Sequence, residues 1–302
     1  MRALVTGASG LIGSAVCDAL LARGDEVVGL TRDPGRARAT NPTVKWLAWN
    51  PESERPPVEA LDGTDGVINL QGEPLNQRWT DEAKARIRAS RIDGTGNLVQ
   101  GIQAASDGPS VLVSQSAVGY YGDRGDTIVD EAAGPGSGFD SRVVVDWEAA
   151  AKEAEGDLRV VIARTGLVLT QRGGLLAELL TPFKLGVGGP LAGGRQYWPW
   201  ISLDDEVGLL LWALGNEKVG GTLNATGPEP VTNREFSKSL GRALNRPAVV
   251  PAPKLALIAR FGAEAADSLA GGQRAVPRRA RDLGYSFRHP DVDTAIQAAL
   301  ND

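Results

Sequence analysis

The chain has 302 residues, enough to bury the core of one large α/β domain with a small appendage. Its net charge of −5 and its dispersed basic residues argue against a nucleic-acid-binding or membrane-surface protein. One cysteine, Cys17, excludes an internal disulfide framework, and one histidine, His289, excludes a His-based triad or a His-rich metal site.

The first predicted strand, residues 3–5, leads into three glycines and then a helix over residues 11–21. Gly7, Gly10 and Gly13 have the spacing of a loop that holds a dinucleotide pyrophosphate over a helix N-terminus. They would provide a tight turn, close backbone approach and close helix–strand packing. The alternative is a loop that merely needs glycine, but the flanking strand and helix favour cofactor binding. The predicted contacts here are Gly7, Ser9, Gly10, Leu11, Ile12 and Gly13.

The second predicted strand, Glu26–Leu30, indicates which dinucleotide is bound. NAD-specific sites place a carboxylate near the end of this strand to bind the ribose 2′-hydroxyl, and Thr31 stands there instead. The guanidinium of Arg32 suits a 2′-phosphate. Alternatively, Arg32 is a solvated loop residue, and the neighbouring Asp33 would serve NAD. We expect NADP in preference to NAD, bound by Thr31 and Arg32.

The chain continues as alternating strands and helices, which is the pattern of a doubly wound parallel sheet. Further strands are predicted at 44–49, 66–70, 110–114, 158–164 and 222–225, and helices at about 81–105, 142–155, 206–215, 232–245 and 254–270. Residues 171–199 are expected to form a glycine-rich, irregular and functional loop. The sequence therefore predicts a Rossmann-like α/β domain over residues 1–170 and a smaller C-terminal substrate-side cap over residues 171–302.

The N-terminus enters the first predicted strand at once, so we expect no signal or transit peptide. No apolar segment is long enough to cross a bilayer. We therefore expect a cytoplasmic protein whose partner is a small-molecule substrate. The sequence indicates no nucleic acid, no membrane and no particular oligomer.

Several segments resemble the extended short-chain dehydrogenases/reductases, namely Gly7–Gly13, Asn69–Gly72, Ser114–Asp123 and Arg164–Leu169. Others resemble the atypical "epimerase family" subgroup, namely Arg78–Thr80, Ser90–Arg91, Gly119–Asp126 and Asp146–Glu148. The tail, about residues 249–298, resembles the small C-terminal domain of unknown function found in that subgroup. The resemblance implies a Rossmann fold that binds NAD(P). It adds Leu70, Gly72, Arg91 and Ser114 to the expected cofactor contacts.

The catalytic pair of ordinary short-chain dehydrogenases is missing. Those enzymes use Tyr-x-x-x-Lys on the helix after the fifth strand, where the lysine lowers the pKa of the tyrosine. None of the four tyrosines here has a lysine four positions later, and residues 139–148 contain neither residue. The structural asparagine expected near Ser90–Thr95 is also replaced. Hydride transfer would therefore need other groups.

Three residues after the fifth strand are the catalytic candidates. Ser116 follows the strand at the edge where open α/β sheets bind ligands, and it could hydrogen-bond a substrate oxygen. Alternatively, it is a turn-forming serine. Tyr120 and Tyr121 lie in the next glycine-flanked turn, where one could supply a phenol or both could serve only as packing. No metal is expected.

A second group of candidate site residues lies in the glycine-rich loop. Residues 193–205 resemble the substrate-loop exit of sugar-nucleotide epimerases and reductases. Arg195 could clamp an anionic group, and Tyr197 and Trp200 offer flat apolar walls, although Trp200 could instead pack beneath the cap. Arg78-Trp79 presents the same choice between ligand contact and packing. The predicted substrate contacts are Arg78, Trp79, Arg195, Tyr197 and Trp200.

Two functions from different classes fit these features. The first is an NADP(H)-dependent oxidoreductase or epimerase-like enzyme acting on a small polar metabolite. The second is a non-catalytic NADP(H)-binding protein that senses redox state or regulates a partner. The missing Tyr-Lys pair favours the second, whereas the loop with its arginine and aromatic residues favours the first. We take the enzyme as the prediction.

Overall fold

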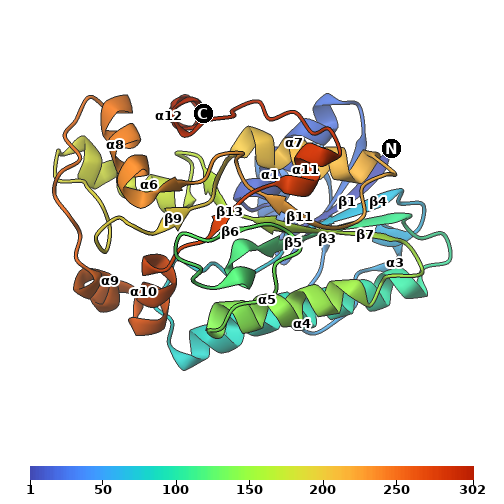
Figure 1. Cartoon of the computed structure of the whole chain (residues 1–302). Coiled ribbons are helices and arrows are strands. Elements are labelled where there is room, and N and C mark those ends of the chain that lie inside the picture. Colours follow the sequence, from blue (N-terminus) through green and yellow to red (C-terminus); the bar gives the residue numbers. More distant parts are fainter.

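The computed structural model describes residues 1–302 and is built on a seven-stranded parallel sheet (Figure 1). The strand order is β11-β7-β5-β4-β1-β2-β3. The order reverses between β1 and β4, which places a ligand-binding crevice at their carboxyl ends. This sheet confirms the predicted doubly wound α/β fold. Its strands are β1 (Arg2–Thr6), β2 (Glu26–Thr31), β3 (Lys45–Ala48), β4 (Gly66–Asn69), β5 (Val111–Ala117), β7 (Arg159–Thr165) and β11 (Gly221–Ala225).

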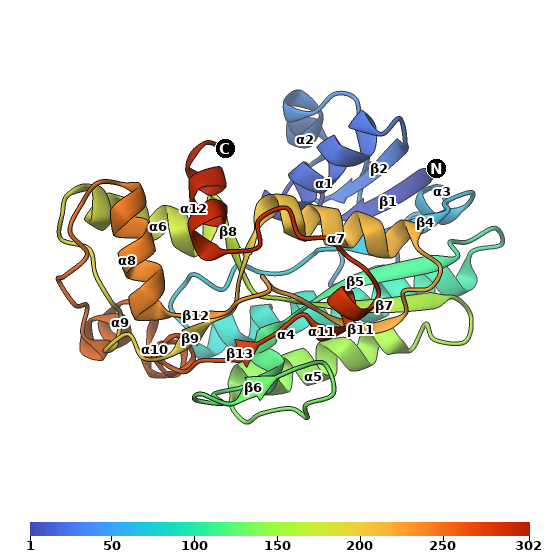
Figure 2. The same cartoon turned by 45° about the horizontal axis from the view of Figure 1, so that its top comes forward.

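Helices cover both faces of the sheet, so its strands are apolar on both sides. α1 (Leu11–Ala22) and α7 (Leu203–Gly215) cover one face, and α4 (Asp81–Ala104) and α5 (Phe139–Lys152) cover the other (Figures 1 and 2). Two short helices, α2 (Pro34–Thr40) and α3 (Val58–Leu61), follow β2 and β3. None of the helices combines the length and the apolar character needed to span a membrane.

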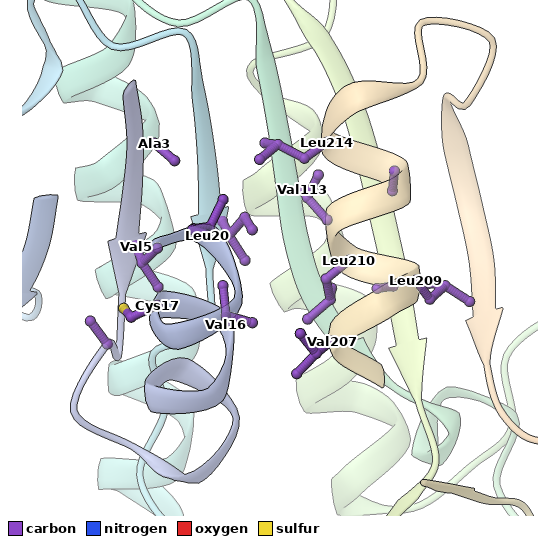
Figure 3. Packing of buried hydrophobic residues seen from close by; sticks show 14 of the residues in the cluster. Ala3, Val5, Val16, Cys17, Leu20, Val113, Val207, Leu209, Leu210 and Leu214 are labelled. Carbon is purple, nitrogen blue, oxygen red and sulfur yellow. The ribbon is translucent and has the colours of Figure 1, made fainter. Parts of the chain in front are cut away.

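The core follows the two-residue period of the strands. Ala3 and Val5 of β1 face the α1/α7 side, where they join a large buried cluster that includes Cys17 (Figure 3). Leu4 faces the opposite side and packs in a second cluster with residues of α4, such as Leu98. Cys17 is 1% exposed and packs as a small hydrophobic residue, and its burial raises the pKa of its thiol to about 12.

A smaller body of helices lies beyond the carboxyl edge of the sheet (Figure 2). It is held together by a separate buried cluster that includes Trp198, Phe236 and Ile296. Its helices are α6 (Gly174–Lys184), α8 (Asn233–Ala243), α9 (Lys254–Phe261), α10 (Ala263–Ala270) and α12 (Val292–Leu300). Short strands and one helix complete the chain: β6 (Ile128–Val129), β8 (Leu167–Leu169), β9 (Tyr197–Trp198), β10 (Trp200–Ser202), β12 (Val231–Thr232), β13 (Arg274–Ala275) and α11 (Arg278–Asp282).

Several predicted elements differ from the structure. Residues 171–199 are not irregular throughout, because α6 occupies residues 174–184. The single helix predicted over 254–270 is two helices separated by Gly262, whose φ of 91° is left-handed. The predicted cap region, 171–302, is interrupted by α7 and β11, which return to the central sheet.

Candidate functional site

The glycine loop between β1 and α1 has the geometry that its spacing indicates. Gly7 has a left-handed φ of 61°, and a Cβ there would lie 2.7 Å from the Leu70 carbonyl oxygen. A Cβ on Gly13 would clash with the Gly7 carbonyl oxygen. Gly10 differs, because the only atom within 4 Å of its built Cβ is the Gly7 oxygen at 3.1 Å. Gly7 and Gly13 are therefore needed for internal packing, whereas Gly10 keeps an outer surface free.

The N-terminus of α1 presents unpaired backbone donors at this surface. Its N-cap is Gly10, no side chain caps the helix, and its first turn carries no acidic residue. Ser9 and Gly10 are exposed. Free N–H groups and the positive end of the helix dipole are complementary to phosphate oxygens. The loop residues present therefore fit the pyrophosphate of a dinucleotide.

The end of β2 bears on the choice between the 2′-phosphate and the 2′-hydroxyl. Asp33, the carboxylate that would serve NAD, caps α2 by accepting a hydrogen bond from the Arg36 backbone N–H at 3.0 Å. Arg32 is exposed and makes no hydrogen bond within the protein. Hydrogen bonds from Gln77 and Arg86 hold the pKa of the Glu73 carboxyl below its ordinary value, and the charge of Arg32 adds to this effect. The Arg32 guanidinium is therefore free and near the segment after β4.

The predicted contacts after β4 and on β5 lie around Asn69. The Asn69 amide donates to Thr95 Oγ1 and to Ser114 Oγ, each at 3.1 Å, and accepts from Thr6 Oγ1 at 2.7 Å. Ser114 is completely buried. Its hydroxyl therefore accepts a hydrogen bond from Asn69, the last residue of β4, within the protein, in contrast to its predicted direct contact with the cofactor.

Arg91 shapes the segment that follows β4. Its guanidinium lies 3.1 Å from a Cβ built on Gly72, donates to the Glu73 carbonyl oxygen at 3.0 Å and lies 5.2 Å from the Trp147 ring centroid. Burial lowers the pKa of Arg91 to about 10. A Cβ at residue 72 would require the buried guanidinium to shift by a few tenths of an ångström, so glycine suits this position. Leu70 is half-buried and Gly72 is exposed beside the glycine turn, where both remain candidates for cofactor contact.

A buried ionic network occupies the region between β5, α5 and β7. Arg164 Nε and Nη2 donate to the two carboxylate oxygens of Glu148 at 2.7 and 2.9 Å, and Ser116 Oγ donates to the same carboxylate at 2.6 Å. Both charged side chains are 3% exposed. Burial alone would lower the pKa of Arg164, but hydrogen bonding and attraction from Glu148 raise it above its ordinary value. Each charged side chain of the pair thus has hydrogen-bond partners within the protein, and the Ser116 hydroxyl is bonded to Glu148.

The two neighbouring tyrosines have different environments. Tyr121 is 0% exposed, donates to Asn224 Oδ1 at 2.7 Å and accepts from Arg164 Nη1 at 3.1 Å. Burial raises the pKa of its phenol to about 12, against a smaller opposing effect of Arg164. These contacts make Tyr121 a structural residue, in contrast to its predicted catalytic role. Tyr120 is half-buried, its hydroxyl has no protein partner, and its ring centroid lies 3.4 Å from Arg164 Cζ.

The predicted substrate contacts also separate into two groups. Trp200, 1% exposed, packs beneath Gly227 and donates from its indole N–H to the Glu229 carbonyl oxygen, so it is a packing residue and not a cleft wall. Arg78 donates to the Ala259 carbonyl oxygen, and Trp79 packs edge-on against Phe139. Arg78 and the backbone N–H of Trp79, which donates to the Phe261 carbonyl oxygen at 2.9 Å, join the cofactor domain to α9. Arg195 is exposed, and the half-buried ring of Tyr197 lies under Arg274.

Sequence reasoning missed the partners that complete these groups, above all Glu148 and Arg164. Glu148 lies in a segment that resembles the subgroup, and Arg164 lies in one that resembles the extended short-chain dehydrogenases/reductases. Charged residues are usually exposed, however, so the burial of these two could not be expected. The one sequence signal that could have identified Glu148 and Arg164 is their position relative to the predicted strands and helices. Glu148 lies on the helix after β5, where ordinary members carry the Tyr-Lys pair, and Arg164 lies one residue before the end of the neighbouring strand, in register with Ser116.

Comparisons with known proteins give a consistent result. The model of the NAD-dependent epimerase/dehydratase family matches residues 3–225, and a domain of unknown function, DUF1731, matches residues 250–299. An epimerase family protein of Mycobacterium bovis is 42% identical over 294 residues, which are 97% of this chain and 95% of that protein. The crystal structure of human epimerase family protein SDR39U1 (isoform 2) with NADPH covers 100% of both chains, with a TM-score of 0.91 and 34% identity. UDP-glucuronic acid 4-epimerase from Bacillus cereus in complex with NAD shares the fold, with a TM-score of 0.78, 18% identity and coverage of 100% of this chain and 96% of that one.

Proposed function

The chain belongs to the NAD-dependent epimerase/dehydratase family, as its motifs indicate, and we propose that it is an NADP(H)-dependent oxidoreductase or epimerase-like enzyme acting on a small polar metabolite. The observation that carries the catalytic proposal is the position of Tyr120. It follows β5 at the carboxyl edge of the sheet, its hydroxyl is free, and its ring lies over the Arg164 guanidinium. A guanidinium on the face of the ring would favour negative charge on the phenol, the part that the lysine has in ordinary members of the superfamily.

The proposal of NADP rests on two observations. The human relative was crystallised with NADPH, and the end of β2 in this chain offers the free Arg32 while Asp33 is engaged in capping α2. A guanidinium pairs with phosphate through two parallel hydrogen bonds, whereas it gains little from a hydroxyl. More distant structures with the same fold contain NAD, so the choice has to be made by residues at this position.

Arg32→Ala should weaken NADPH binding about tenfold or more and leave NADH binding nearly unchanged. The reason is that a charge-assisted hydrogen bond contributes about 1.5–3 kcal/mol, and a tenfold change in Kd corresponds to about 1.4 kcal/mol. Titration calorimetry with both cofactors measures the effect. Arg23→Ala is the matched control, because it removes an arginine that pairs with Asp25 beyond the C-terminus of α1, away from the glycine loop. Equal losses for NADPH and NADH would contradict the assignment.

The proposed chemistry assigns one role to each residue around Tyr120. When bound, the nicotinamide supplies or accepts the hydride. Tyr120 would transfer the proton to or from the substrate oxygen, and Arg164 would stabilise the negative charge that develops on the phenol. Glu148 and Ser116 are positioning residues, because their hydrogen bonds fix the Arg164 guanidinium. Arg195 and Tyr197 are the proposed substrate contacts.

One observation favours the non-catalytic alternative. The polar groups that replace the Tyr-Lys pair, namely Ser116, Glu148, Arg164 and Tyr121, are buried and bonded to one another. A protein that only binds NADP(H) to sense redox state would need no further free acid or base. The two functions therefore differ in the role of Tyr120, the remaining phenol of this turn.

Tyr120→Phe should lower turnover about a hundredfold, within the usual range for a lost general acid, and leave the Kd of NADPH unchanged. The substrate is first identified by mass spectrometry of metabolites retained by the purified protein. Tyr121→Phe is the contrasting variant. It leaves Asn224 Oδ1 and Arg164 Nη1 without a hydrogen-bond partner, so it should lower the thermal midpoint more than the turnover. If no retained metabolite is converted while NADPH binds, the non-catalytic function is the correct one.

A further inference from the structure

Gln71, directly after Leu70 at the end of β4, has a side chain whose polar atoms are unsatisfied. The residue is 6% exposed, and neither its amide oxygen nor its amide nitrogen has a hydrogen-bond partner. Proteins rarely bury both polar atoms of an amide without partners, because the desolvation is not compensated. The unpaired amide therefore suggests a polar group that is not part of this chain.

The position of Gln71 relates it to two parts of the candidate cofactor site. On one side, a Cβ on Gly7 would lie 3.0 Å from the Gln71 backbone nitrogen, so the residue adjoins the glycine turn that would hold the pyrophosphate. On the other side, its amide nitrogen lies 2.6 Å from a Cβ built on Gly94, which itself would lie 3.2 Å from Pro51 Cβ. The amide thus occupies a slot between α4 and the segment after β3.

The segment after β3 continues toward the proposed 2′-phosphate site. The Trp49 backbone N–H donates to the Thr31 carbonyl oxygen at 3.0 Å, and Asn97 of α4 donates to the Pro51 carbonyl oxygen at 2.8 Å. The adenosine of a dinucleotide held by its pyrophosphate at Gly10 and by its 2′-group at Arg32 would extend along the carboxyl ends of β2 and β3, the side of the sheet on which Pro51 and the Gln71 slot lie. This placement rests on the proposed NADP(H) site.

We propose that Gln71 recognises the adenine base of the cofactor. Adenine presents its exocyclic amine as a donor beside a ring nitrogen as an acceptor, and a glutamine amide is complementary to that pair through its oxygen and its NH₂ group. Both amide atoms are buried beside Gly94 in the position that the structure shows, so pairing requires the Gln71 side chain to rotate toward the edge of the slot. The base then satisfies the two atoms that the protein leaves unpaired.

The test compares Gln71→Leu with the unmodified chain in calorimetry and thermal denaturation. Leucine removes both polar atoms at similar volume, so NADPH binding should weaken about tenfold, whereas the thermal midpoint without cofactor should stay the same or rise. A merely structural glutamine would give the opposite pair of results, a lower midpoint and unchanged affinity. Gln100→Leu, on the exposed face of α4, controls for the substitution itself.

A second probe assigns the contact to the base. 1,N6-etheno-NADP, whose added ring removes the exocyclic amine donor, should bind the unmodified chain about tenfold more weakly than NADP, and Gln71→Leu should bind both about equally. The same preference for NADP in both proteins would overturn the proposal for adenine. Failure of the unmodified chain to bind NADP or NADPH would instead overturn the proposed cofactor site.

Discussion

Glu148→Leu should lower the free energy of unfolding by about 3–5 kcal/mol, the usual cost of removing one partner of a buried ion pair. Arg164 is 3% exposed, and Glu148 provides its only carboxylate contact. The substitution would therefore leave a guanidinium buried with only the Tyr121 hydroxyl as a hydrogen-bond partner. For a chain of this length, the loss corresponds to a fall in the thermal midpoint of about 5–8 °C.

Two further variants test whether the unpaired buried charge causes this loss of stability. Asp146 lies on the same helix and pairs with Arg88. The two side chains are 43% and 53% exposed, so Asp146→Leu should lower the free energy of unfolding by less than about 1 kcal/mol. Glu148→Leu combined with Arg164→Met removes both charges and should recover much of the lost stability. Chemical denaturation of the unmodified chain and of the three variants measures these differences in the free energy of unfolding. A double variant as unstable as Glu148→Leu would show that packing, and not the unpaired charge, is the cause.

The fold could be predicted largely from sequence because a doubly wound sheet buries both faces of its strands. Such strands appear as short apolar runs, as in residues 3–5 and 66–70, and they alternate with helical stretches. The glycine loop could be predicted from sequence equally well, because the reasons for its glycines are local. Gly7 needs a left-handed φ, and Gly13 needs room for one backbone to approach another. Neither depends on distant parts of the chain.

Helix α6 could not be recognised for a physical reason. Its N-cap and its first residue are both glycine, and it contains Pro182, and both features weaken a helix when it is considered alone. Leu176, Leu180 and Phe183, however, lie on one face, which the cap buries. Tertiary packing of that face outweighs the local preference. The glycine-rich pattern thus described only the residues that follow the helix.

The polar network was beyond sequence reasoning because its members meet only in three dimensions. Glu148 is on α5, Arg164 on β7 and Ser116 on β5, and no local pattern indicates that the two charges are buried together. Tyr120 and Tyr121 show the same limit. Adjacent residues of one turn have unrelated roles, because the turn directs one phenol to Asn224 and leaves the other hydroxyl free.

Gly10→Val should abolish binding of both NADPH and NADH, with a loss of roughly a thousandfold in affinity, or about 4 kcal/mol. The surface of Gly10 is the one that the pyrophosphate would need, at the uncapped N-terminus of α1. A branched side chain there would fill the space for the phosphates and cover the backbone N–H groups. Because the loss concerns the pyrophosphate, which both cofactors share, it should not depend on the 2′-group.

The fold should survive this change, which makes the result interpretable. Gly10 has an ordinary φ of −80°, and its built Cβ meets only the Gly7 carbonyl oxygen, at 3.1 Å. A valine at Gly13 would instead clash with backbone and could prevent folding. Gly215→Val, at the far end of α7 with nothing within 4 Å of its Cβ, is the matched control. Calorimetry and thermal denaturation should show lost binding with an intact transition for Gly10→Val alone. Retained binding in that variant would mean that the phosphates lie elsewhere on the molecule.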